Sequence, residues 1–257
     1  MKIAVLIKQV PAKDAPIVIS QDRLWIDESE LEFAISEPDD YALEAALQLR
    51  DAHGGEVVAI SLGPGRVEKA LRVALAKGAD RAIHIGEDSP HALDALQIAG
   101  ALAGAAKNES FDLVLSGLQS DDMGLGETGV IFAELLDMAH STVVVELGLE
   151  GSTLSLKREL EGGWFQNVQV DLPAVLSIQS GMNKPRYTTL KGIIAAKRKK
   201  IAEVALADVM PPDIQATVRT TGLSMPQHTK NIEFLEGGPA EQAAALVEKL
   251  KNDIRVL

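Results

Sequence analysis

The chain has 257 residues, 46% of them hydrophobic, which is enough to bury the core of one main domain with an additional segment. A formal net charge of -12 argues against a nucleic-acid partner, because phosphate binding depends on Lys and Arg. The absence of cysteine excludes disulfides, cysteine-ligated iron–sulfur clusters and thiol chemistry, so a redox role would need a bound organic cofactor.

The N-terminal segment is predicted to be a buried strand. Its apolar run, Ile3 to Ile7, is closed by Lys8 and followed by no cleavage site, so neither a signal peptide nor a transit peptide is indicated. All apolar runs stay below the roughly 18 residues that a membrane span requires. We therefore expect a cytoplasmic protein without membrane insertion.

Short apolar runs then alternate with longer segments of helical period. This alternation is typical of βαβ units around a mostly parallel sheet. Ser89 before Pro90 predicts the start of a helix, and Gly78 predicts the end of the preceding one. The runs cover residues 3–7, 38–51, 57–62, 67–76, 82–85, 90–106, 113–115 and 128–136.

From about Ser141 the pattern changes. Four strand-like runs, residues 142–145, 154–157, 168–170 and 174–178, follow without long helices between them, which predicts hairpin-like structure. Beyond Tyr187 come a basic helical stretch, a polar segment with several prolines, and an amphipathic helix from about Pro239 to Asn252. This tail reads as an arm that packs on a partner, although its composition also fits a flexible C-terminus.

The segment Gly124 to Gly129 satisfies the dinucleotide fingerprint G-x-G-x-x-G. The fingerprint should directly follow the first strand of a βαβ unit, whereas here it comes after the fourth strand and residues 117–123. A glycine-rich crossing that opens into a helix near Glu127 still suits a phosphate, because glycines allow close backbone approach and a helix start offers free N–H groups. An ordinary flexible loop is the alternative.

Two further loops belong to the same argument. The turn after Lys8 and the loop Ser61 to Gly65 also follow strand ends, and such ends converge on one crevice in an open parallel sheet. These loops and residues 117–129 could therefore line one nucleotide site. The sequence G-x-x-x-x-G-K-[ST] does not occur, so a P-loop NTPase is not indicated.

Catalytic patterns are otherwise missing. The 5 histidines are scattered without metal-ligand spacing, and no G-x-S-x-G elbow occurs. Asp121 and Asp122 could form an acid–base pair, but adjacent carboxylates on a loop more often shape turns. A basic stretch before Glu203 is either a docking surface for a negatively charged partner or a solvated helix face. It contains Lys184, Arg186, Lys191, Lys197, Arg198, Lys199 and Lys200.

Several segments resemble the beta subunits of electron transfer flavoproteins, in the same order and over nearly the whole chain. The specific block comprises Arg158 to Gly163, Leu172 to Ile178 and Asn183 to Tyr187, followed by Thr189 and Leu190. Upstream, the matching segments are Lys2 to Val10, Ser61 to Pro64, Ala74 to Arg81 and Asp112 to Gln119. The resemblance implies a Rossmann-like, doubly wound, mostly parallel sheet of the adenine nucleotide alpha hydrolase-like type, with a C-terminal arm packed on an alpha subunit.

It also implies a division of the chain into a nucleotide-binding α/β domain, 1–187, a recognition loop with its basic helix, 188–203, and a C-terminal arm, 204–257. AMP without redox chemistry would bind this chain, while the alpha subunit would hold most of the FAD. Gly124, Gly126 and Thr128 would cradle the phosphate. The full implied AMP site is Leu6, Ser36, Glu37, Pro38, Asp39, Leu62, Gly117, Leu118, Gln119, Ser120, Asp121, Asp122, Met123, Gly124, Leu125, Gly126, Glu127 and Thr128.

For partner docking, the resemblance implies that Leu190, next to Lys191, anchors a dehydrogenase and that Glu159 contacts the mobile flavin domain of the alpha subunit. This chain departs from the residue pattern of the family at two places. Lys13 stands about where some members place an aromatic residue near the flavin, and residues 121–126 lack the acid and asparagine pattern of the mitochondrial type.

The implied function is electron carriage without independent turnover. Electrons would pass from a flavoprotein dehydrogenase to the FAD of the alpha subunit and on to a quinone oxidoreductase-type acceptor. One alternative is a bifurcating member, in which a second FAD replaces AMP. Another is a universal-stress-like ATP-binding module that acts as a homodimer, which would leave the C-terminal arm and the block 158–187 without an explanation.

Overall fold

The computed structural model describes residues 1–226 and 232–256 and divides the chain into two compact units, Met1–Leu223 and Ser224–Leu257. The second unit contains the helix α7 (Pro239–Lys249), which continues into a π-helical turn (Leu250–Ile254). The predicted terminal helix is thus confirmed. Among the described residues, no helix combines the length and apolarity needed to cross a membrane.

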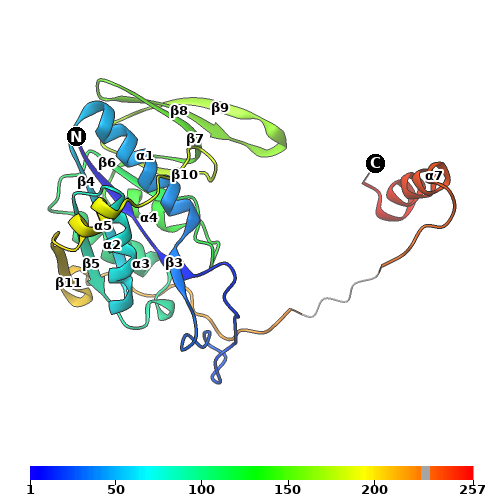
Figure 1. The fold of residues 1–257 in the computed structure, drawn as a ribbon, viewed down its shortest axis with the longest axis horizontal. Helices are drawn as coiled ribbons and strands as arrows, with labels where there is room; N and C mark the ends of the chain where they lie inside the picture. Colours follow the sequence, from blue (N-terminus) through cyan, green and yellow to red (C-terminus); the bar gives the residue numbers. More distant parts are fainter. Residues whose placement is uncertain (227–231, 257) are drawn as a thin grey trace. The chain divides into compact units, whose positions relative to one another are not determined.

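The first unit is built on a sheet of nine strands in the order β11-β5-β4-β1-β6-β10-β7-β8-β9 (Figure 1). Seven strands, from β11 to β7, run parallel, and β8 and β9 continue the sheet antiparallel. This confirms the Rossmann-like, mostly parallel sheet. The strands are β1 (Lys2–Leu6), β4 (Glu56–Gly63), β5 (Arg81–Gly86), β6 (Leu113–Gly117), β7 (Ala139–Glu150), β8 (Thr153–Glu159), β9 (Phe165–Asp171), β10 (Ala174–Ile178) and β11 (Ile201–Ala205).

Helices cover both faces of the parallel strands (Figure 1). Successive residues of β1 point to opposite faces, so that Ile3 and Val5 pack under α1 and α2, while Ala4 and Leu6 pack under α3 and α4. Burial on both faces explains why these strands read as continuous apolar runs. The helices are α1 (Glu37–His53), α2 (Glu68–Lys77), α3 (Ala95–Ala106), α4 (Thr128–Leu135), α5 (Leu190–Ala196) and α6 (Leu206–Val209).

The chain reverses its winding direction at β1. It first adds β4 and β5 on one side of β1, and then crosses to β6 on the other side. In open parallel sheets, ligands bind in the crevice outside the carboxyl ends of the strands at such a switch point. The topology therefore points to the ends of β1 and β6. A small antiparallel pair, β2 (Gln9–Pro11) and β3 (Phe33–Ile35), connects β1 to α1.

Two helix boundaries were predicted with different success. Gly78 ends α2 with a φ of 136°, a conformation open to glycine, as expected. The predicted start of α3 at Pro90 is wrong, because residues Pro90–Ala92 form only a 3-10 turn. The helix begins at Ala95, where Asp94 accepts a hydrogen bond from the Gln97 amide at 2.9 Å and the Gln97 side chain caps in return.

The hairpin prediction for the later strands holds for β7, β8 and β9 only. Strand β10 instead returns to the sheet and lies parallel between β6 and β7. Its fully buried sequence, Ala174 to Ile178, fits a central position. Sequence periodicity does not report which strands pair, so the insertion of β10 was not visible from it.

The compact unit extends well beyond residue 187. Helix α5 packs on α2, and β11 pairs with β5 at the edge of the sheet. Residues after β11 pack on α3, where a Cβ on Gly104 would lie 1.9 Å from the Val209 carbonyl oxygen. The first compact unit therefore ends at Leu223.

Candidate functional site

The ends of β1 and β6 are joined through the first turn of α1. The buried carboxylate of Asp39 accepts hydrogen bonds from the amides of Lys8 and Gly117, each at 2.8 Å. Lys8 follows β1, and Gly117 is the last residue of β6. Ser36, which precedes α1 and is fully buried, donates its amide to the Lys8 carbonyl at 2.9 Å. One helix start thus fixes both walls of the switch-point crevice.

Burial raises the pKa of Asp39 to about 7, although its two amide hydrogen bonds favour the charged carboxylate. The folded chain therefore holds the Asp39 proton more tightly than the unfolded chain does. It follows that the stability from this group is fully present below its ordinary pKa of 3.8 and is lost as the pH rises through about 7.

Replacing Asp39 by asparagine is expected to flatten the pH dependence of stability. An asparagine side chain cannot ionise. The free energy of unfolding of the variant should therefore rise relative to that of the wild type by roughly a few kcal/mol as the pH rises from about 5 to about 8. The denaturant midpoint of both proteins, measured at several pH values across this range, tests the expectation. Midpoints that stay a constant distance apart would show that Asp39 titrates outside the range.

The loop that follows β6 is held by contacts across the crevice. The Lys8 ammonium donates to the Asp122 carboxylate at 2.8 Å, and the Asp121 carboxylate accepts the Glu37 amide at 2.7 Å. The Asp121 amide in turn donates to the Ser36 hydroxyl at 3.1 Å. Burial raises the pKa of Asp122, but the Lys8 charge and the hydrogen bonds from Lys8, Ser120 and the Met123 amide together outweigh burial and hold the pKa below its ordinary value. Both carboxylates thus shape the loop, in agreement with the turn-forming interpretation.

The same loop approaches the neighbouring backbone closely at glycines. A Cβ on Gly117 would lie 2.6 Å from the Pro38 side chain and 2.7 Å from the Asp39 amide nitrogen. Gly124 and Gly126 have φ values of 62° and 70°, which side chains disfavour. Gly117 thus permits the close approach of β6 to α1, and Gly124 and Gly126 permit the positive-φ turns of the loop.

The helix α4 begins directly against the sheet. A Cβ on Gly129 would lie 2.7 Å from the Ser116 hydroxyl on β6 and 2.9 Å from the Ser177 hydroxyl on β10. The first-turn N–H groups of a helix have no intrahelical acceptor and favour an anion. Because several carboxylates flank the crevice, backbone amides rather than charged side chains would have to hold a phosphate. The glycines and the helix start are therefore suited to hold a phosphate group.

All the residues of the predicted AMP site lie at this end of the sheet. Leu6 is buried at the end of β1, Leu62 lies near the end of the adjacent strand β4, and residues 36–39 open α1. Residues 117–128 form the last residue of β6, the loop and the start of α4. Sequence reasoning did not identify the side chain of Lys8, although a lysine directly after a buried strand is a usable signal.

The predicted docking residues do not form one group. Leu190 is the first residue of α5 and is 75% exposed, and Lys191 beside it is also exposed. Glu159 ends β8 and accepts a hydrogen bond from Gln179 at 3.1 Å. Helix α5 packs on α2 next to β11, whereas β8 lies near the other end of the sheet order. Leu190 and Glu159 therefore belong to separate surfaces.

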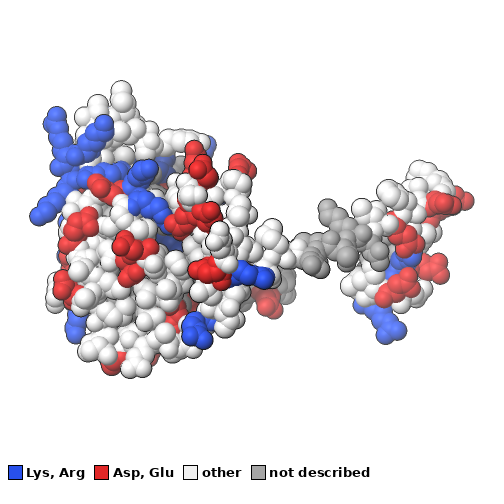
Figure 2. Space-filling model, turned by 90° about the horizontal axis from the view of Figure 1, so that it is seen from below, with Lys and Arg blue, Asp and Glu red and all other residues white. Residues whose placement is uncertain are grey.

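The basic stretch is only partly free for docking. Arg186 pairs with Glu44 and Asp51, and the Lys199 ammonium donates to the Ala79 carbonyl. Figure 2 shows Lys and Arg side chains gathered at one end of the compact unit, the end where α5 lies in Figure 1. The exposed members of the stretch are Lys184, Lys191, Lys197, Arg198 and Lys200.

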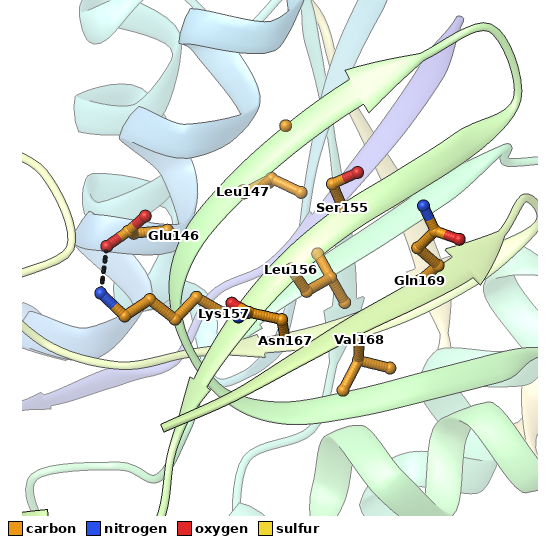
Figure 3. Close-up of a pocket in the computed structure, with 9 residues that line it drawn as sticks. Glu146, Leu147, Ser155, Leu156, Lys157, Asn167, Val168 and Gln169 are labelled. Carbon is orange, nitrogen blue, oxygen red and sulfur yellow. Dashed lines mark hydrogen bonds and ion pairs between the residues drawn. The ribbon is translucent and has the colours of Figure 1, made fainter. Parts of the chain in front are cut away.

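Two surface hollows are lined by residues other than those of the predicted AMP site. The larger, of about 780 Å³, is lined by polar and apolar residues of β7, β8 and β9, among them Glu146 and Lys157, which pair at 2.7 Å (Figure 3). The smaller, of about 260 Å³, lies at the ends of β4 and β5. Neither is lined by the residues of the switch-point crevice, so the contacts described above, rather than surface shape, define the candidate site.

The histidines in the described part of the chain form no metal site, and His228 lies outside the described residues. His84 is buried on β5, where its ring nitrogens contact the Glu203 carboxylate at 2.7 Å and the Gly63 carbonyl at 2.8 Å. This ring has a structural role in joining strands. Within residues 1–226 and 232–256, no group of three or more His, Asp or Glu side chains is arranged to hold a metal ion.

Comparison with known proteins agrees with the geometry. A family model described as "Electron transfer flavoprotein domain" matches residues 23–209. The chain is 37% identical to the electron transfer flavoprotein subunit beta of Methylophilus methylotrophus, over 96% of this chain and 97% of that protein. It is 34% identical to the subunit beta of Bacillus subtilis over the full length of both. For the human subunit beta, the identity is 32% over 100% of this chain and 99% of the relative.

Proposed function

Because this chain belongs to the electron transfer flavoprotein family and matches its beta subunits over the full length, we propose that it binds AMP and pairs with an alpha subunit. In this proposal the chain is an electron-carrier subunit with no turnover of its own. The FAD held mainly by the alpha subunit supplies the redox chemistry.

The proposed AMP site is the switch-point crevice. The amides of the loop 117–127 and of the first turn of α4 would hold the phosphate, with the Thr128 hydroxyl as an additional donor. Asp39 and Ser36 hold the crevice open by fixing the ends of β1 and β6. The nucleotide supplies no redox chemistry there and acts as part of the scaffold.

The proposed docking element is the segment 188–200. It presents Leu190 at the start of α5, with exposed Ile193 and Ile194 one turn further on. An apolar anchor with basic residues around it suits a flavoprotein dehydrogenase with an acidic surface, because charges speed encounter and the anchor supplies affinity. Electrons would then pass through the FAD of the alpha subunit to a quinone oxidoreductase-type acceptor. Glu159, on its separate surface, would contact the flavin domain of the alpha subunit.

The observation that carries the proposal is the buried Asp39 carboxylate, which accepts one amide from each of the two strands at the switch point. A buried carboxylate is costly unless hydrogen bonds compensate for its lost hydration, and here both amide donors belong to the strand ends that form the crevice. The same helix start also holds the loop 117–127, so the phosphate-binding segment and the strand ends form one unit.

Release of the bound nucleotide tests the function. The chain is purified together with its alpha subunit, the pair is denatured by heat, and the supernatant is separated by chromatography. We expect one AMP and one FAD per pair. Two FAD and no AMP would instead identify a bifurcating member, and ATP without flavin on a homodimer would contradict the proposal.

A further inference from the structure

The start of the docking segment is fastened to α1 by a partly buried ion pair. The Glu44 carboxylate, whose side chain is 6% exposed, accepts hydrogen bonds from the Arg186 side chain at 2.8 and 3.1 Å and from the Arg186 amide at 3.1 Å. Burial raises the pKa of Glu44, but these bonds outweigh it and hold the pKa below its ordinary value. Beside this pair, the Asn183 side chain donates to the Tyr41 carbonyl at 3.0 Å.

The end of the docking segment is fastened to α2. The Arg72 guanidinium donates to the carbonyls of Ala196 at 2.8 Å and Lys199 at 2.6 Å, where the last turn of α5 would otherwise leave acceptors unpaired. The Lys199 ammonium donates to the Ala79 carbonyl at 2.5 Å, directly after α2. Strand β11 then continues from this point into the sheet.

Between these two attachments, α5 lies directly on α2. A Cβ on Gly192 would lie 2.3 Å from the Ala76 carbonyl oxygen, and Ala196 is buried. Close packing on this side leaves Leu190, Ile193 and Ile194 on the outside, at 75%, 41% and 51% exposure. An isolated helix of this length would not be stable, because nucleation is costly. Its shape therefore depends on the attachments.

We infer that Glu44 is a positioning residue for dehydrogenase docking, which acts through Arg186 to hold the segment 188–200 in its binding conformation. This inference rests on the proposed docking function. A segment that is already ordered loses less conformational entropy when the partner binds, so the attachment raises affinity without touching the partner. The block Asn183 to Tyr187 thereby has a physical role as the clamp at the start of the segment.

The test compares Glu44→Gln with Asp51→Asn in the purified pair. Both substitutions remove one negative charge near Arg186, but Asp51 is 49% exposed and contacts Arg186 at 3.1 Å, so its loss should matter little. With a flavoprotein dehydrogenase that reduces the wild-type pair, Glu44→Gln should raise KM for the pair about tenfold and leave kcat within about twofold. Asp51→Asn should leave both within about twofold.

Hydrogen exchange gives a readout that needs no donor. In α5, the Ile193 amide bonds to the Thr189 carbonyl and the Lys197 amide bonds to the Ile193 carbonyl. In the Glu44→Gln variant, these two amides should exchange about tenfold faster than in the wild type, while the amides of β1 and β6 should keep their protection. The variant Arg186→Gln and the double variant with Glu44→Gln complete a double-mutant cycle. The KM of the double variant should not exceed that of the weaker single variant, because both substitutions break the same ion pair.

Unchanged KM and unchanged exchange in a folded, nucleotide-loaded Glu44→Gln pair would overturn the inference. So would a rise in KM accompanied by loss of flavin and nucleotide, since that would show a general effect on the fold. Failure of the docking function itself is recognised separately, because Leu190→Ala would then leave KM unchanged as well.

Discussion

Replacing Gly117 by alanine is expected to destabilise the chain by about 3 kcal/mol and to strip the nucleotide from the purified pair. The added Cβ would lie 2.6 Å from the Pro38 side chain and 2.7 Å from both the amide nitrogen and a carboxylate oxygen of Asp39. These neighbours belong to the first turn of α1 and are held on both sides, so they cannot move without breaking the hydrogen bonds of Asp39 to β1 and β6.

Gly148→Ala is the matched control. Gly148 lies on β7, away from the crevice, its φ is unexceptional, and a Cβ there would make only ordinary contacts, 3.8 Å from the Ser155 carbonyl oxygen and 4.0 Å from the Ser155 Cβ. This variant should keep the wild-type nucleotide content and unfold within about 0.5 kcal/mol of the wild type. Thermal unfolding and nucleotide release are measured on all three proteins. If the Gly117→Ala pair kept its full nucleotide content, the nucleotide would not bind at the switch-point crevice.

Replacing Leu190 by alanine is expected to lower kcat/KM for reduction by a dehydrogenase between about tenfold and a hundredfold. The side chain is 75% exposed and is supported by the α5 backbone, so the substitution removes partner contact without leaving a cavity in the core. Nucleotide content, flavin content and thermal stability should therefore match the wild type.

Leu135→Ala serves as the control for Leu190, because Leu135 is an exposed leucine, at 39%, at the end of α4 and away from α5. It should leave the reduction rate unchanged. The remaining rate in Leu190→Ala should still fall as salt is raised, because the basic residues around α5 act on encounter and are screened by ions. Equal rates for Leu190→Ala and wild type with every dehydrogenase tested would remove Leu190 from the docking site.

Much of the candidate site follows from the sequence because its pieces are local. A loop after a buried strand, glycines that permit positive φ and a helix start near Glu127 are all features of neighbouring residues. The resemblance added residues 36–39, which come just before a helix and give no nucleotide signal of their own. The sequence pattern could not show that Asp39 joins two strands, since its partners Lys8 and Gly117 are 31 and 78 residues away.

The sequence also could not show which residues of the basic stretch are free for docking. Seven positive residues predicted either a docking surface or a solvated helix face, and the fold divides them between roles. Arg186 reaches Glu44, 142 residues away, and Lys199 reaches Ala79, 120 residues away, so both are structural attachments. The others stay exposed around α5.

By itself, the sequence determined the family, the parallel α/β core and the strand-end loops, because periodicity, turn residues and family motifs are properties of nearby residues. Only the tertiary structure decided the place of β10 between β6 and β7, the start of α3 and the inclusion of residues 188–223 in the compact unit. It also decided which acids and bases pair. Strand order and ion pairs are set by contacts between residues far apart in the chain, and the free energy of those contacts leaves no periodic trace in the sequence.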